Sequence, residues 1–93
     1  MAHKYKSNGE LERIVKGFAN HRRLQILELL GKEPELSVIE VSEKVKSDFK
    51  NISSHINKMT ISGLLMKRND FHFVRHKLTK RGIQVLKFVR TLE

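Results

Sequence analysis

The segment Phe49–Gly63 constrains the fold of this chain most, because its residues sort into an apolar and a polar face at helical spacing. The apolar residues, which share one narrow arc at 100° per residue, are Phe49, Ile52, Ile56 and Met59. The opposite face carries the polar side chains of Lys50, Ser54, Asn57 and Lys58. Such side chains can bind phosphates and read the edges of bases. The pattern predicts a helix over residues 49–62 that either enters DNA or presents an ordinary solvated face.

The charge distribution favours a nucleic acid as the partner. Residues 1–48 hold 9 Lys and Arg against 8 Asp and Glu, whereas residues 49–93 hold 10 against 2. A half-chain of one sign repels itself unless a polyanion neutralises it, so we expect double-stranded DNA to bind there. An anionic membrane surface is the weaker alternative, because no apolar run approaches the roughly 18 residues of a spanning helix. The start of the chain has no apolar stretch typical of a secretory signal, and we expect a cytoplasmic protein.

The residue types exclude several classes of enzyme and of metal site. A chain without cysteine has no disulfide, no thiolate nucleophile and no Cys-ligated zinc. Ser53, Ser54 and His55 are adjacent on one predicted helix and cannot form a catalytic triad, and paired acids or a glycine-rich phosphate loop are absent from the sequence. We therefore expect neither an enzyme nor a cofactor.

The five histidines do not predict a metal site. They are His3, His21, His55, His72 and His76. The last two are four residues apart on a predicted strand, which separates them by about 13 Å at the ~3.3 Å rise per residue. His55 lies at the flank of the apolar arc, where we expect a partly buried structural histidine.

Shorter segments with capping signals precede the central helix. Residues 1–9 lack apolar periodicity and are predicted to form a flexible basic arm, and residues 10–19 a first helix. Asn20 is the expected N-cap of a second helix, which we expect Gly31 to end.

A third helix begins with Ser37 as its N-cap and Glu40 as the partner in a capping box. The turn at residues 46–48, with Ser47 or Asp48 as the next cap, joins this helix to the central one. Two short helices joined by a tight turn, with polar groups exposed on the second, form the helix-turn-helix arrangement.

After the central helix the pattern changes to a β-hairpin and a last helix. Strands are predicted at Leu64–Arg68 and Phe73–Leu78, around a turn at Asn69 and Asp70. The last helix follows Thr79, and its apolar residues are Ile83, Val85, Leu86, Phe88, Val89 and Leu92. They cover roughly 220° of the helical wheel, whereas packing against one body needs only ~100°. We expect this helix to contact both its own domain and a second copy of the chain.

The order helix, helix, helix-turn-helix, hairpin, helix resembles the winged helix-turn-helix regulators, and the residues are most similar to the ArsR/SmtB group. Ala19–Leu27 reads ANHRRLQIL and is similar to that group's Ala-Asp-Pro-x-Arg-Leu-x-Ile-Leu. Ser53–Ile56 (SSHI) and Gly63–Leu65 (GLL) are similar to its Ser-x-His-Leu and Gly-Leu-Val. The resemblance, over about residues 10–92, implies a homodimer that represses genes at an operator, with the first and last helices at the interface. For Arg23 it also suggests a structural ion pair, besides contact with phosphate.

The resemblance does not extend to the group's metal sites. Metal-sensing members carry Glu-Leu-Cys-Val-Cys on the third helix, where this chain has Glu35-Leu36-Ser37-Val38-Ile39. The last helix holds no histidine, and after His76 the only acid is Glu93. We expect no metal at either site.

Together these patterns predict a mainly α fold with about five helices and a two-stranded wing, a winged helix-turn-helix over residues 10–93. The residues predicted to bind DNA are Lys50, Asn51, Ser53, Ser54, Asn57, Lys58, Lys67, Arg68, Arg75 and Lys77. Those predicted at the dimer interface are Leu11, Ile14, Phe18, Ile83, Leu86 and Val89. We predict a dimeric repressor that reads a pseudo-palindromic site with the helix at 49–62. The alternatives are a sequence-tolerant nucleoid or RNA-binding protein, and a winged-helix module that binds an acidic protein.

Overall fold

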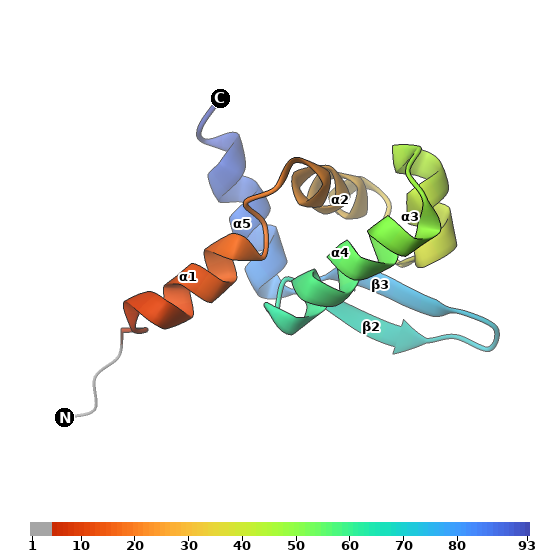
Figure 1. Cartoon of the computed structure of the whole chain (residues 1–93), viewed down its shortest axis with the longest axis horizontal. Helices are drawn as coiled ribbons and strands as arrows, with labels where there is room; N and C mark the ends of the chain where they lie inside the picture. Colours follow the sequence, from red (N-terminus) through yellow and green to blue (C-terminus); the bar gives the residue numbers. More distant parts are fainter. Residues whose placement is uncertain (1–4) are drawn as a thin grey trace.

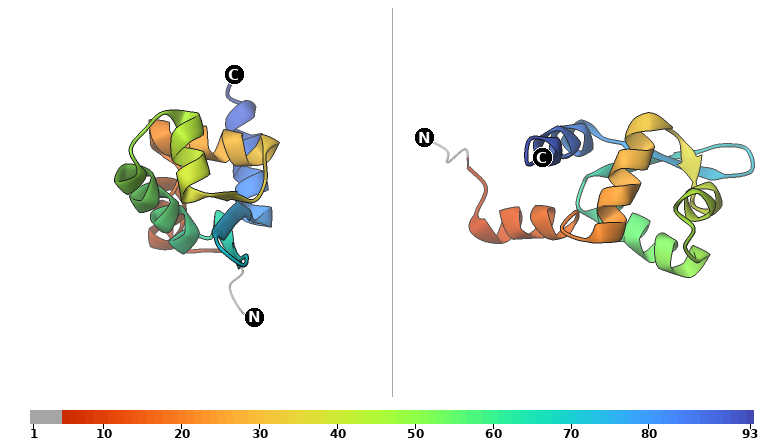
Figure 2. Two further views of the ribbon diagram at one scale, coloured as in Figure 1. Left: turned by 90° about the vertical axis from the view of Figure 1, so that its right-hand side faces the viewer. Right: turned by 90° about the horizontal axis from the view of Figure 1, so that it is seen from above.

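A computed structural model describes residues 5–93 and confirms the winged helix-turn-helix (Figure 1). Its elements in chain order are α1 (Asn8–Lys16), α2 (His21–Lys32), β1 (Leu36–Ser37), α3 (Val38–Val45), α4 (Phe49–Ile61), β2 (Leu65–Asn69), β3 (Val74–Leu78) and α5 (Lys80–Arg90). Helices α2, α3 and α4 pack with the sheet into one body. Helices α1 and α5 lie at one end of the molecule and the wing formed by β2 and β3 lies at the other (Figure 2).

The core consists of the apolar stripes of α2, α3 and α4 together with the strand residues beneath them. Its buried members are Ile26, Leu27, Leu30, Leu36, Val41, Ile52, Ile56, Met59, Leu64 and Leu65. Burying each Leu or Ile side chain stabilises the fold by about 1.5–3 kcal/mol relative to exposure. Phe49 was predicted to share the stripe of α4, but it is the first residue of the helix and remains 53% exposed.

The helix ends follow local capping, but α1 spans Asn8–Lys16 where residues 10–19 were predicted, and α2 extends one residue beyond the predicted end. The Ser7 side chain accepts a hydrogen bond from the Glu10 backbone in a capping box, so α1 begins at Asn8, inside the segment predicted to be a flexible arm. The first four residues of that arm lie outside the described residues. Helix α2 passes Gly31 and ends at Lys32. Asp48, rather than Ser47, caps α4.

The sheet has three strands, whereas the sequence predicted only a hairpin. The strand order is β1-β3-β2, and β1 pairs Leu36 with His76 and Ser37 with Arg75. A strand of two residues is too short to show alternation, which explains why the pattern missed it. The wing turn begins one residue later than predicted and is closed by a hydrogen bond of 2.7 Å from the Asp70 N–H to the Phe73 carbonyl. Strand β3 therefore joins the wing to the start of α3.

Candidate nucleic-acid interface

Helix α4 presents an exposed polar face that the rest of the domain leaves unoccupied. Lys50, Ser54 and Asn57 are exposed on the side opposite the buried Ile52. Their side chains make no hydrogen bond or ion pair with other residues of 5–93. Asn51 differs, because its amide donates to the Ser47 hydroxyl over 3.3 Å. The polar face is thus rigidly carried by a packed helix and available to a ligand.

A groove of about 690 Å³ separates α4 from the wing. Its lining residues are Val38, Phe49, Lys50, Ser53, Ser54, Ile56, Asn57, Lys67, Val74 and His76. Five of these were among the residues predicted to bind DNA, and four come from α4. The fifth, Lys67, comes from β2. The groove therefore brings the polar face of α4 together with one cation of the wing.

The wing has two faces that differ in their role. The strand pairing matches Lys67 with His76 and Arg68 with Arg75, so the first pair points to the groove and the second to the opposite face. Lys77 lies on the same outer face as Arg75. Of the four wing cations predicted to bind DNA, only Lys67 lines the groove beside α4.

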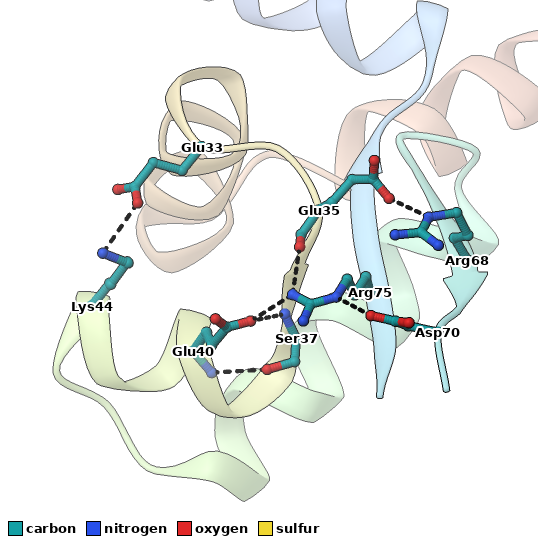
Figure 3. A network of polar contacts seen from close by, with 8 residues as sticks. All are labelled: Glu33, Glu35, Ser37, Glu40, Lys44, Arg68, Asp70 and Arg75. Carbon is teal, nitrogen blue, oxygen red and sulfur yellow. Dashed lines mark hydrogen bonds and ion pairs between the residues drawn. The ribbon is translucent and has the colours of Figure 1, made fainter. Parts of the chain in front are cut away.

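The two arginines of the outer face are paired with acids of the same chain (Figure 3). Arg75 Nε donates to Asp70 Oδ2 over 2.9 Å, and its Nη1 donates to Glu40 Oε1 and the Glu35 carbonyl over 3.1 Å each. Arg68 Nε pairs with the Glu35 carboxylate. The hydrogen bond with Asp70 raises the pKa of Arg75, and the same bond lowers the pKa of Asp70. These contacts neutralise both arginines within the domain.

Glu40 connects the wing to α3, a role that the sequence did not reveal. Its carboxylate accepts a hydrogen bond from the Ser37 N–H over 2.9 Å and also binds Arg75. The bond with the Ser37 backbone is the main cause that lowers the pKa of Glu40. The capping box was visible in the sequence, but the partner 35 residues away depended on the pairing of β1 with β3.

Arg23 of α2 and His55 of α4 form a polar contact between the two helices. Arg23 Nε donates to His55 Nδ1 over 3.0 Å, and Arg23 Nη1 donates to the Lys16 carbonyl over 2.6 Å. Burial lowers the pKa of His55, and the nearby charges of Arg23, Lys58 and Arg22 lower it further. Of the two roles expected for Arg23, the structural one fits, although its partner is a histidine and not an acid. The partly buried structural role expected for His55 fits too.

His76 is 3% exposed, and its Nδ1 has no hydrogen-bond partner in the described part of the chain. Burial lowers the pKa of His76, while a hydrogen bond with the Leu36 backbone opposes that effect. His72 was predicted to share a strand with His76, but it lies in the wing turn, because β3 begins at Val74. Within residues 5–93 no three His, Asp or Glu side chains come close enough to hold a metal ion. His3 lies outside these residues.

The terminal helices leave apolar side chains exposed. Leu11 on α1 is 46% exposed and Ile83 on α5 is 45% exposed, as an interface with a second copy requires. Ile14 and Val89 are half-buried. Phe18 and Leu86, predicted at the same interface, instead pack against the core of their own domain. Thus α5 uses the middle of its wide apolar arc for its own chain and leaves the flanks uncovered.

A family profile described as winged helix-turn-helix DNA-binding matches residues 20–66, from the cap of α2 into β2. No curated protein matches the chain significantly by sequence. Within the described residues, no helix combines the length and apolar character needed to span a membrane.

Solved structures of transcriptional regulators share the fold. One is the homodimeric winged helix-turn-helix DNA-binding domain of Mb0332 from Mycobacterium bovis, described as a possible ArsR-family regulator. Its sequence is 22% identical and its structure superposes with a TM-score of 0.82, and the match covers 99% of this chain and 89% of the Mb0332 chain. HlyU from Vibrio cholerae is 28% identical with a TM-score of 0.80, covering 96% and 97%. The transcriptional repressor BigR from Xylella fastidiosa is 21% identical with a TM-score of 0.75, covering 90% and 86%.

Proposed function

Since this chain belongs to the winged helix-turn-helix DNA-binding family, we propose that it is a homodimeric transcriptional repressor that reads a pseudo-palindromic operator with α4. It acts in the cytoplasm and carries out no catalysis. The observation that supports this proposal best is the groove in which the unoccupied polar face of α4 meets Lys67 of the wing.

The groove side of α4 has the chemistry for reading bases. Asn57 can form two hydrogen bonds with the major-groove edge of an adenine, and Ser54 can bond to any of the bases. Lys50 and Lys67 both line the groove, where they can bind the phosphates of one strand while α4 occupies the major groove. Base contacts on α4 and phosphate contacts around it together define a half-site.

Exposed apolar residues on α1 and α5 support the dimer. A soluble monomer gains nothing from leaving Leu11, Ile83 and Phe88 in water, whereas a second copy would cover them. These helices lie at the end of the molecule opposite the wing tip, so dimerisation leaves the groove free (Figure 2). A two-fold dimer places two copies of α4 about 34 Å apart, one turn of the DNA helix. The description of the Mb0332 domain as homodimeric agrees with this arrangement.

The test is to select binding duplexes from a random pool and to measure their affinity for the Asn57→Ala variant. We expect a loss of about 1–3 kcal/mol on the selected duplex and little change on a scrambled one. Lys67→Ala is the control, because Lys67 lies on the wing and not on α4, and we propose that it contacts phosphate. Its loss should be similar on both duplexes.

Two results would contradict the proposal. Equal losses on both duplexes for Asn57→Ala would favour the sequence-tolerant alternative. Failure to enrich any duplex, together with binding of an acidic protein from nuclease-treated extract, would favour the protein-binding module.

A further inference from the structure

The tip of the wing is aromatic and carries no cation. Residues 69–74 read NDFHFV, and within them Phe71 is 92% exposed and Phe73 47% exposed. The wing cations lie nearer the base, at Lys67, Arg68, Arg75 and Lys77. The single acid of the tip, Asp70, is already paired with Arg75. Because residues 69–74 contain no Lys or Arg, the tip offers no such side chain to a phosphate.

Local contacts hold the tip in one conformation. The Asp70 N–H donates to the Phe73 carbonyl and the Phe71 N–H donates to Asp70 Oδ1, both over 2.7 Å. The rings of Phe71 and His72 meet edge to face with centroids 5.0 Å apart, and the Arg75 guanidinium lies 5.5 Å from the Phe73 ring centre. Arg75 is in turn bound to Glu40 of α3, so the tip is tied to the body of the domain (Figure 3).

The position of the tip follows from the groove. Lys67 lines the groove beside α4, and β2 continues for two more residues to Asn69 before the turn. At the ~3.3 Å rise per residue this places the tip about 7 Å or more beyond Lys67. The turn accordingly projects past the end of α4 (Figure 1). With α4 in the major groove and a phosphate strand beside Lys67, the next feature of the duplex that the tip meets is the neighbouring minor groove.

We propose that Phe71 is an apolar wedge that enters this minor groove, partly unstacks one base step and bends the DNA. The proposal rests on the proposed function of α4. The Phe71 ring is 92% exposed on a turn that hydrogen bonds close, so it is free to enter a narrow groove. Apolar side chains at such positions insert between base pairs and kink the duplex. Pyrimidine–purine steps unstack most easily, so the wedge also adds sequence preference where no hydrogen bond is made.

The test compares Phe71→Ala with Phe71→Leu on a duplex selected by the wild-type protein. Three quantities are measured: affinity, bending by energy transfer between the duplex ends, and permanganate oxidation of unstacked thymines. The wild type and Phe71→Leu should bend the duplex and make a thymine at one flanking TA step reactive. Phe71→Ala should abolish both signals and lower the preference for that TA step over a GC step by about fivefold or more.

Lys67→Ala serves as the control, because it removes a proposed phosphate contact and leaves the tip intact. It should weaken binding while the bound duplex stays bent.

Tight binding without bending by the wild type, or unchanged bending by Phe71→Ala, would overturn the wedge and leave the proposed function standing. Loss of self-association in Phe71→Ala with unchanged bending would assign the tip to a second copy instead. Failure of the wild type to select any duplex would refute the function itself.

Discussion

Helices α4 and α5 are both amphipathic, and they differ in which face remains exposed. Helix α4 buries its apolar stripe and exposes amides, hydroxyls and lysines, which water solvates well. Helix α5 buries only the middle of its apolar arc and leaves Ile83 and Phe88 in contact with water. Each Å² of exposed apolar surface costs about 25 cal/mol relative to burial. One chain therefore completes the packing of α4, whereas a single chain leaves the apolar flanks of α5 uncovered.

Placing charges on the exposed apolar surface of α1 and α5 should have the largest effect on self-association and on DNA affinity. We predict that Leu11→Glu combined with Ile83→Glu gives a folded monomer, because both side chains are exposed in the single chain. Affinity for the operator should fall by about 100-fold or more, since each half-site then loses the contacts of the second subunit. Sedimentation and fluorescence anisotropy check the two outcomes.

Gln84→Glu is the control for the added charge, because Gln84 is an exposed polar residue next to Ile83. It should leave both the dimer and the affinity unchanged. Leu86 is unsuitable for this test, because it packs on the core and a charge there would unfold the domain. A wild-type protein that is monomeric at tens of micromolar and still binds the operator fully would refute the dimer.

A smaller effect, on the salt dependence of DNA affinity, should distinguish the groove face of the wing from its outer face. Lys67→Ala should lower the dependence of log affinity on log salt concentration by about 0.9, the value for one released phosphate contact. Arg75→Ala should leave that slope unchanged and lower the melting temperature, because Arg75 binds Asp70 and Glu40 instead. Affinity measured over a salt series and thermal unfolding provide the data.

Lys77→Ala is the control for the outer face, because Lys77 is an exposed cation beside Arg75 in the sheet. An unchanged slope for Lys77→Ala would show that position, and not pairing with acids, decides which cations contact DNA. A slope lowered by about one unit in Arg75→Ala would instead return the outer face to the interface.

The smallest effect concerns pH and the histidines that support α4 and the groove. The folded state lowers the pKa of both His55 and His76, mainly through burial. As the pH falls below about 6.5, the unfolded chain therefore takes up protons before the folded one does. The contribution to stability is complete above that pH and is lost as the pH falls toward the folded pKa values.

We expect the melting temperature to drop by a few degrees between about pH 7.5 and about pH 5.5. His76→Gln should flatten this dependence more than His55→Gln, because His76 is almost fully buried. An unchanged pH dependence in both variants would show that other groups titrate in this window.

The sequence by itself determined the helices and most of their boundaries. Caps act over two or three residues, so Asn20 and Ser37 could be recognised without knowing the fold, and Asp48 was one of two candidates. The period of the apolar residues then showed which face of α4 is buried and which is free. Where that signal is weak, at the first residue of α4, Phe49 was wrongly assigned to the core.

Only the tertiary structure decided which wing cations line the groove beside α4 and which are paired with acids of the same chain. The pairing of Leu36 with His76 joins segments 40 residues apart, and a strand of two residues carries no periodic signal. That pairing sets the register of β3, and a shift of one residue would exchange its two faces. It places Arg75 against Glu40, where the sequence had predicted a contact with DNA. Charge can be counted along a chain, but the partner of each charge depends on contacts between distant residues.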